Sequence, residues 1–157
     1  MPGESLSQIA YDSAVRALDL QERGIEQLRA RTGTLLAASS LTASFLGALA
    51  IQHSATFGAL DALGLIAMVS SITLCVYVLL PKKGFVFSLS GPGVYEELFE
   101  FREDMAEIHR RLIYWLEDYW EANQAKVDIL GRFYLAAAVG LLIQLILWAS
   151  ALGATLS

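Results

Sequence analysis

The stretch "LRARTGTLLAASS", residues 28–40, passes from an arginine-bearing segment into apolar and small residues without a proline or a cluster of turn formers. A helix that begins in the charged part therefore meets no stop signal at Arg29 or Arg31. We expect a single helix to continue across this boundary, with both arginines at the edge of a lipid bilayer and the following residues inside it.

The composition of the 157-residue chain supports this interpretation, since 55% of its residues are hydrophobic and 17% are charged. Such a chain is too apolar for a soluble protein of this size. We therefore predict an all-α membrane protein with three transmembrane helices and a cytoplasmic amphipathic helical bundle.

Three uncharged runs are long enough to cross a bilayer, which takes about 20 apolar residues. We place the spans at 33–52, 62–80 and 133–155. The expected organisation is a cytoplasmic amphipathic helix (1–31), a two-helix transmembrane hairpin (32–81), a cytoplasmic linker with a long heptad-like helix (82–132), and a third transmembrane helix with a short outer tail (133–157).

The positive charges indicate an orientation, because cytoplasmic flanks of membrane proteins retain Lys and Arg. All 11 Lys and Arg residues lie in 1–31 or 82–132. The N-terminus is therefore expected in the cytoplasm and the C-terminus outside. The N-terminal segment is not expected to be a secretory signal, because it mixes acids and arginines where a signal peptide has an apolar core.

A heptad-like pattern follows the break at "GPG" (91–93), after the segment "FVFSLS" (85–90), which alternates as a strand does. Apolar residues then recur in steps of four and three, at Val94, Leu98, Phe101, Met105, Ile108, Leu112, Trp115, Tyr119 and Ala122. This spacing predicts a helix whose apolar seam packs in a coiled coil, against the N-terminal helix or the same helix of another subunit. We therefore expect a homo-oligomer.

Several function classes are disfavoured by the sequence. The predicted orientation separates His53 from His109, and Cys75 is the only cysteine, so no metal or catalytic constellation is expected. A net charge of -5 argues against a nucleic acid polymer as partner. We predict a protein that is not an enzyme and needs no cofactor or metal.

Polar side chains occur near the middle of each predicted span, at Thr42, Ser44, Ser70, Ser71, Thr73 and Gln144. They are expected either to form interhelical hydrogen bonds or to line a water-filled path in an oligomer. Gln144 is the most informative, because an amide in hydrocarbon seeks a partner. Small residues permit close helix contact in either case, at Ser39, Ala43, Gly47, Ala136 and Gly140.

Basic residues are expected to converge at the inner interface or near it, at Arg29, Arg31, Lys82, Lys83, Arg110, Arg111 and Arg132. They either anchor and orient the chain or, with His109, form an anion site for lipid headgroups or a phosphate-bearing ligand. The six acidic residues in 96–107 oppose the second hypothesis. Four aromatic residues, Tyr114, Trp115, Tyr119 and Trp120, are expected to pack or to stack on a ligand, with Tyr114 and Trp120 as candidates for a ligand or second-subunit contact.

The entry segment "LQERGIEQLRARTGTLLAASSLTASFLG", the coupled hairpin and the following cytoplasmic helix resemble the small SLATT and Pycsar-type membrane effectors of bacterial anti-phage systems. The resemblance covers the layout of roughly residues 10–125, and its motif is Arg29 and Arg31 followed by small residues and leucines. It implies a bacterial inner-membrane protein that responds to a nucleotide signal or a partner sensor and permeabilises the membrane. The third span and the lack of a separate nucleotide-binding domain depart from those families and point to a partner as the trigger.

The expected function is therefore a non-enzymatic effector of antiviral defence, in which the cytoplasmic helices regulate oligomerisation or opening of a pore. The alternative is a membrane-anchored scaffold whose cytoplasmic helices bind a partner protein. A small transporter subunit is the least favoured hypothesis, because no charged residue lies within a predicted span to bind a coupling ion.

Overall fold

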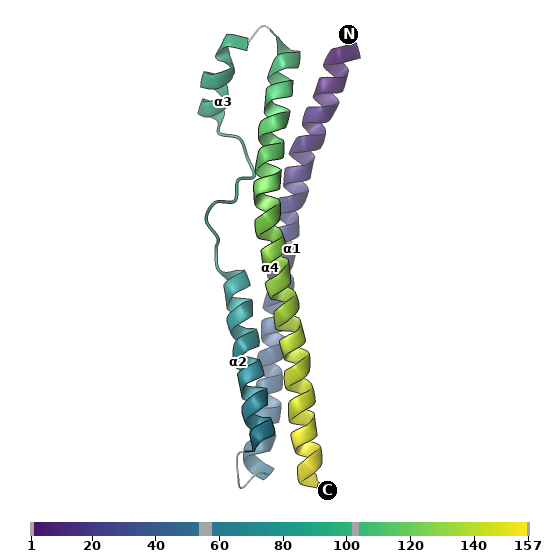
Figure 1. Cartoon of the computed structure of the whole chain (residues 1–157), viewed down its shortest axis with the longest axis vertical. Coiled ribbons are helices and arrows are strands. Elements are labelled where there is room, and N and C mark those ends of the chain that lie inside the picture. Colours follow the sequence, from purple (N-terminus) through teal and green to yellow (C-terminus); the bar gives the residue numbers. More distant parts are fainter. Residues whose placement is uncertain (1, 54–57, 102–103, 157) are drawn as a thin grey trace. The chain divides into compact units, whose positions relative to one another are not determined.

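The structure, a computed structural model, describes residues 2–53, 58–101 and 104–156, and every regular element in those ranges is helical. Helix α1 covers Pro2–His53, α2 covers Ala59–Leu79, α3 covers Gly91–Leu98, and α4 covers Met105–Leu156 (Figure 1). A single 3₁₀ turn, η1, covers Phe99–Phe101. The prediction of an all-helical chain is confirmed.

The chain divides into two compact units. The charged unit comprises Met1–Glu26 and Lys82–Asp128, and the apolar unit comprises Gln27–Pro81 and Ile129–Ser157. The sequence places fifteen of the sixteen acidic residues and eight of the eleven basic residues in the charged unit. Helices α1 and α4 each contribute residues to both units, because each is one uninterrupted helix.

Helix α1 runs through residues 28–40 without a break, as the sequence predicts. Its hydroxyl side chains bond to backbone carbonyls one turn earlier: Thr32 Oγ1 donates to Leu28 O at 2.7 Å, and Ser40 Oγ donates to Leu36 O at 3.0 Å. Such bonds let a helix carry hydroxyl groups through apolar surroundings. The arginine-bearing segment and the apolar run therefore belong to one continuous helix.

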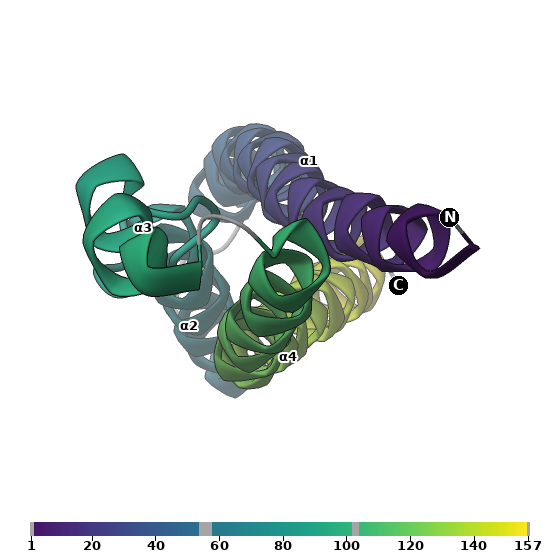
Figure 2. The same ribbon diagram turned by 90° about the horizontal axis from the view of Figure 1, so that it is seen from above.

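Segments of α1, α2 and α4 stand at three corners of the apolar unit when it is viewed from above (Figure 2). Helices α2 and α4 are antiparallel, because Tyr77 packs edge-on against Phe133 at 4.7 Å between ring centroids and Gly64 faces Trp148. Helix α2 begins at a cap in which Gly58 N donates to Asp61 Oδ2 at 3.0 Å. That bond gives the one acidic residue of this unit a structural role.

Two helices, α2 and α4, are long and apolar enough to cross a membrane. Only 22% of the most apolar window of each is buried within the structure, so these helices are not enclosed as the core helices of a soluble protein are. Both contain a stretch predicted as a span, 62–80 and 133–155. The remaining stretch, 33–52, lies in α1; many of its side chains after Phe45 fall outside the described residues, and its crossing of a membrane stays a prediction.

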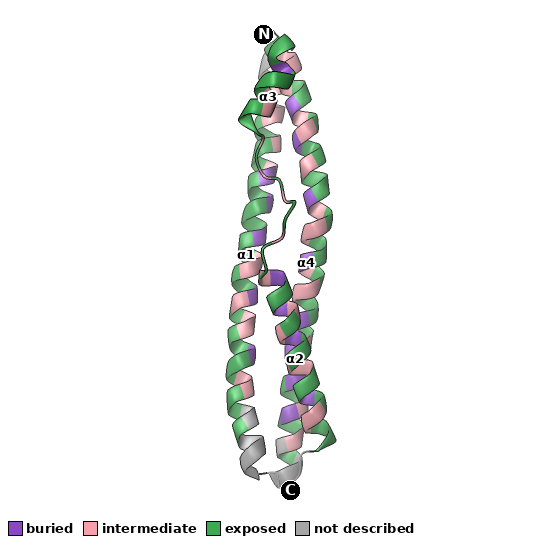
Figure 3. Ribbon diagram, turned by 90° about the vertical axis from the view of Figure 1, so that its left-hand side faces the viewer, coloured by how far each residue is buried: buried purple, intermediate pink, exposed green. Residues whose placement is uncertain are grey.

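Buried positions recur every seven residues along each long helix. The rows are Leu18, Ile25, Thr32 and Ser39 on α1; Gly64, Ser71 and Val78 on α2; and Leu116, Asn123, Leu130, Ala137 and Gln144 on α4. A seven-residue repeat keeps one stripe of a helix against its neighbours in a left-handed coiled coil. Figure 3 shows these buried positions as short bands along each ribbon.

The helix expected to run unbroken through 94–122 is divided in the structure into α3, η1 and the start of α4. Asp104 begins the new helix, because its Oδ1 accepts hydrogen bonds from Ala106 N and Glu107 N, both at 3.1 Å. An aspartate in this position is a strong helix N-cap. The prediction of one continuous helix with a single apolar seam through 94–122 was therefore wrong.

The seam residues take different environments. Leu98 and Leu112 are buried; Val94, Phe101, Ile108, Trp115 and Tyr119 are half-buried; Met105 and Ala122 are exposed. Leu116, which the seam omits, is buried instead. The segment 85–90 contains no strand: Val86 pairs with the Asn123 side chain, accepting from Nδ2 at 2.8 Å and donating to Oδ1 at 3.2 Å.

Candidate functional site: unpartnered polar groups in the apolar unit

Four polar side chains are enclosed in the apolar unit: Thr32, whose hydroxyl bonds to Leu28 O, and one unpaired side chain from each long helix. Ser39 of α1 and Gln144 of α4 are 0% exposed, and Ser71 of α2 is 1% exposed. Within the described part of the chain, none of their side-chain polar atoms has a hydrogen-bond partner. Leaving a buried polar group unpaired costs about 1–3 kcal/mol. The apolar unit therefore carries polar groups that would gain free energy from a hydrogen-bond partner.

Ser71 and Gln144 lie at neighbouring levels between α2 and α4. A Cβ added at Gly140 would collide with Ser71 Oγ, which shows that the hydroxyl lies against the α4 backbone. Gln144 follows Gly140 by one helical turn and so occupies the same face of α4. The prediction that small residues allow close helix contact holds at Gly140, where a larger residue would not fit without a change at Ser71.

The other polar residues expected to act within the spans have different surroundings. Ser44 and Thr73 are exposed and bond to their own helix, Ser44 Oγ to Ser40 O at 2.9 Å and Thr73 Oγ1 to Val69 O at 2.8 Å. Ser70 is exposed and Thr42 is half-buried. Of the six residues predicted as intramembrane contacts or pore lining, only Ser71 and Gln144 are enclosed between helices.

The basic residues predicted at the inner interface are divided between the two units. Arg29, Arg31 and Arg132 belong to the apolar unit, whereas Lys82, Lys83, Arg110 and Arg111 belong to the charged unit. Arg31 and Arg132 are exposed; Arg29 is half-buried, and its Nε has no partner among the described residues.

Glu107 pairs with two of these basic residues. Arg110 Nε donates to Glu107 Oε2 at 2.8 Å, and Arg111 Nε donates to Oε1 at 2.8 Å. Hydrogen bonds from Arg110 and Arg111 lower the pKa of Glu107 to about 2, and the pKa of Arg110 is raised by the same contact. Arg111 also lies 4.0 Å above the Phe101 ring. These contacts engage both arginines within the charged unit and disfavour their use in an anion site.

Sequence reasoning missed four of the enclosed polar groups. Ser39 was noted only as a small residue, and Gln21, Thr32 and Asn123 were not noted at all. Gln21 Nε2 donates to Trp120 O at 3.2 Å and to Gln124 Oε1 at 3.0 Å, while its own Oε1 has no partner in the described chain. The signal that could have found Ser39 and Asn123 is the seven-residue spacing itself.

The arrangement places unpaired polar groups of three helices inside the apolar unit. Comparison with protein-family models, with curated proteins and with solved structures finds no match for this chain. The proposals that follow therefore rest on the chain's own residues.

Proposed function

We propose that this protein is a non-enzymatic effector of the bacterial inner membrane, which permeabilises that membrane as an oligomer when its charged unit is triggered. In the resting state the apolar unit keeps Ser39, Ser71 and Gln144 between its helices. Separation of these helices brings the three polar groups into contact with water and opens a path for ions. A role in anti-phage defence follows from the resemblance in layout.

The observation that carries this proposal is the set of unpaired polar groups inside an otherwise apolar unit. A helix bundle selected only for anchoring has no use for polar groups that lower its stability. Most outward side chains of α2 are apolar, among them Leu63, Ile66 and Val69, although Ser70 and Thr73 are exposed as well. A bundle with a mainly apolar outer surface and unpaired polar groups in its interior suits a protein whose helices separate to open a path.

The test is ion conductance by the full-length protein in liposomes, compared with that of Gln144→Leu. Leucine removes the amide and keeps a similar volume, so the closed state gains stability and the open state loses a hydrated group. We expect at least a fivefold lower dye or ion leak, since about 1–3 kcal/mol separates a paired from an unpaired buried group. Ser71→Ala should act in the same direction and more weakly.

Matched controls are Thr73→Val and Ser150→Ala. Both remove a hydroxyl from an exposed position where it already bonds to its own helix, Thr73 to Val69 O and Ser150 to Ile146 O at 2.8 Å each. Leak through these variants should equal that of the parent. Parent protein that never leaks under any candidate nucleotide or partner, or a Gln144→Leu variant that leaks as much as the parent, would contradict the proposal.

The alternative function is that of a membrane-anchored scaffold, and one feature of the charged unit favours it. An open cavity of about 270 Å³ lies between α1 and α4, lined by Ile113, Leu116 and Trp120 among others. A side chain of a partner protein would fit there. Under this alternative Gln144→Leu leaves partner binding intact and Trp120→Ala removes it, so co-purification with these two variants separates the functions.

A further inference from the structure

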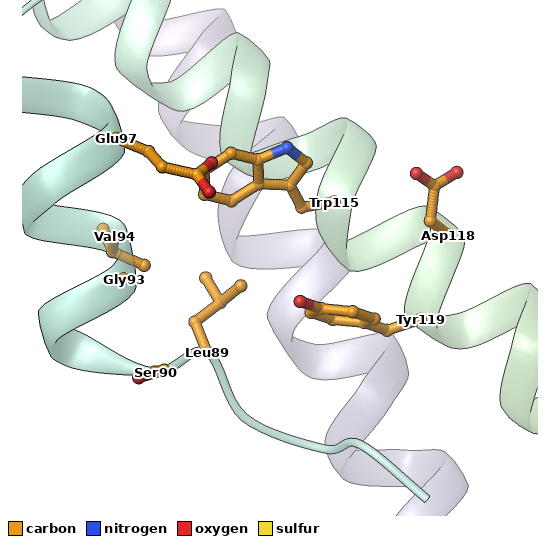
Figure 4. A pocket seen from close by; sticks show the side chains of 8 residues that line it. All are labelled: Leu89, Ser90, Gly93, Val94, Glu97, Trp115, Asp118 and Tyr119. Carbon is orange, nitrogen blue, oxygen red and sulfur yellow. The ribbon is translucent and has the colours of Figure 1, made fainter. Parts of the chain in front are cut away.

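A second cavity of the charged unit, of about 300 Å³, lies between α3 and α4. Helix α4 contributes Trp115 and Tyr119 to the lining of this cavity. They are four residues apart and therefore lie on one face of the helix. The opposite wall is formed by the start of α3 and the residues before it, including Leu89 and Val94. Figure 4 shows both aromatic rings pointing from α4 toward the side of α3.

This cavity depends on the break between α3 and α4. On one unbroken helix, Val94 and Trp115 would be about 32 Å apart, since each residue adds 1.5 Å. The turn at Phe99–Phe101 and the cap at Asp104 instead bring both residues to the lining of one cavity.

Two carboxylates belong to the lining, Glu97 from α3 and Asp118 from α4; the Asp118 side chain points away from α3 in Figure 4. In Figure 4 the Glu97 side chain extends from α3 toward Trp115. Neither carboxylate makes an ion pair or hydrogen bond within the described chain, and the lining contains no Lys or Arg. An aromatic face attracts a cation through its quadrupole, and nearby carboxylates strengthen that attraction.

Two other aromatic rings of the charged unit already have a cation from the chain. Arg111 lies 4.0 Å above the Phe101 ring, and Lys126 lies 5.4 Å from the centre of the Phe85 ring. Trp115 and Tyr119 have no such neighbour among the described residues. With its fifteen acidic and eight basic residues, this unit also attracts cations and repels phosphates.

We infer that the cavity between α3 and α4 binds a small organic cation with an alkylated ammonium head, held against Trp115 and Tyr119 and paired with Glu97. A volume near 300 Å³ is at the lower end for ligand sites, so the ligand is small. The inference does not rest on the proposed membrane function, because binding is measurable whether or not the protein conducts ions.

The probe is choline, titrated by calorimetry into the full-length protein in a maltoside detergent, which carries no ammonium group. The matched control ligand is 3,3-dimethyl-1-butanol, which has the same shape with carbon in place of the charged nitrogen. We expect saturable binding of choline and at least fivefold weaker binding of the neutral alcohol. Equal affinity for both would show apolar contact alone and overturn the inference, as would the absence of saturable choline binding.

Variants then test the residues. Glu97→Gln and Trp115→Leu should each weaken choline binding by about tenfold. The control Glu96→Gln makes the same charge change at the neighbouring exposed residue of α3, which does not line the cavity, and should weaken binding less than twofold.

If Glu96→Gln and Glu97→Gln lowered the affinity for choline equally, only the overall negative charge of the unit would attract the cation. That result would overturn the inferred site. Glu97→Gln keeps the size of the side chain at an exposed position, so the inference remains testable if Trp115→Leu perturbs folding.

Discussion

At the scale of single residues, a buried side-chain amide stabilises the fold when it has hydrogen-bond partners and destabilises it when it has none. Asn123 in the charged unit is 1% exposed and both ends of its amide are paired, with Val86 N and Val86 O. Gln144 in the apolar unit is equally enclosed and pairs with nothing among the described residues. The same chemical group therefore stabilises one unit and weakens the other.

Replacing Asn123 should consequently destabilise the charged unit. Asn123→Leu leaves the backbone N–H and C=O of Val86 without partners, at a cost of about 1–3 kcal/mol. Hydrogen exchange of the Val86 amide, measured by mass spectrometry or NMR, should become faster by at least fivefold.

The control for Asn123 is Gln8→Leu, an amide removed from an exposed position of α1 in the same unit. It should leave exchange at Val86 unchanged. Unaltered protection of Val86 in Asn123→Leu would show that the two hydrogen bonds contribute nothing to holding the 85–90 segment.

At the scale of elements, the packing of α2 against α4 depends on glycines that face large or polar side chains. A Cβ at Gly64 would collide with the indole of Trp148, and a Cβ at Gly140 would collide with the hydroxyl of Ser71. The first neighbour is a rigid ring that is itself buried, whereas the second is a hydroxyl that one bond rotation can move. The two contacts should therefore respond differently to the same substitution.

Gly64→Ala is expected to lower the stability of the apolar unit by about 1–3 kcal/mol, the usual cost of overpacking. Gly140→Ala should cost less, because the Ser71 hydroxyl can rotate toward its own helix and alanine favours the helix by about 0.5–1 kcal/mol. Thermal unfolding in detergent measures both.

Gly131→Ala is the matched control, because nothing lies within 4 Å of its added Cβ. It should be neutral or stabilising. If Gly64→Ala unfolds at the same temperature as Gly131→Ala, the contact between Gly64 and Trp148 does not constrain the helices.

At the scale of the whole molecule, charge is distributed unevenly along the chain. The apolar unit carries Asp61 as its one acidic residue and three arginines, Arg29, Arg31 and Arg132, whereas the charged unit has nearly twice as many acids as bases. The three arginines lie at the chain ends of the apolar runs, where positive residues mark the cytoplasmic side of a membrane protein. This distribution predicts the orientation.

Reporter fusions test that orientation. A reporter that is active only outside the cytoplasm should be active when fused after Ser157 and inactive when fused before Met1, because all eleven Lys and Arg residues lie in segments predicted as cytoplasmic. Substituting Arg29, Arg31 and Arg132 together by Gln should reduce this asymmetry. An inactive Ser157 fusion would contradict both the orientation and the count of three spans.

The sequence by itself determined the helical class, the continuity of α1 through residues 28–40, and the positions of α2 and the apolar end of α4. These features follow from local signals: uncharged runs, Pro81 after the second run, and no proline or cluster of turn formers between Arg29 and Ser40. The division between α3 and α4 was missed because the apolar spacing across 94–122 continues through Asp104, and a short-range cap there outweighed the longer pattern.

Only the tertiary structure decided which polar groups are enclosed and which cavity is formed. In an apolar run every face looks alike in composition, so nothing local distinguishes Ser71, which is buried, from Ser70, which is exposed. The cavity bounded by Glu97 and Trp115 likewise required α3 to pack beside α4. Both results depend on contacts between residues distant in the chain, and such contacts are set by packing rather than by local propensity.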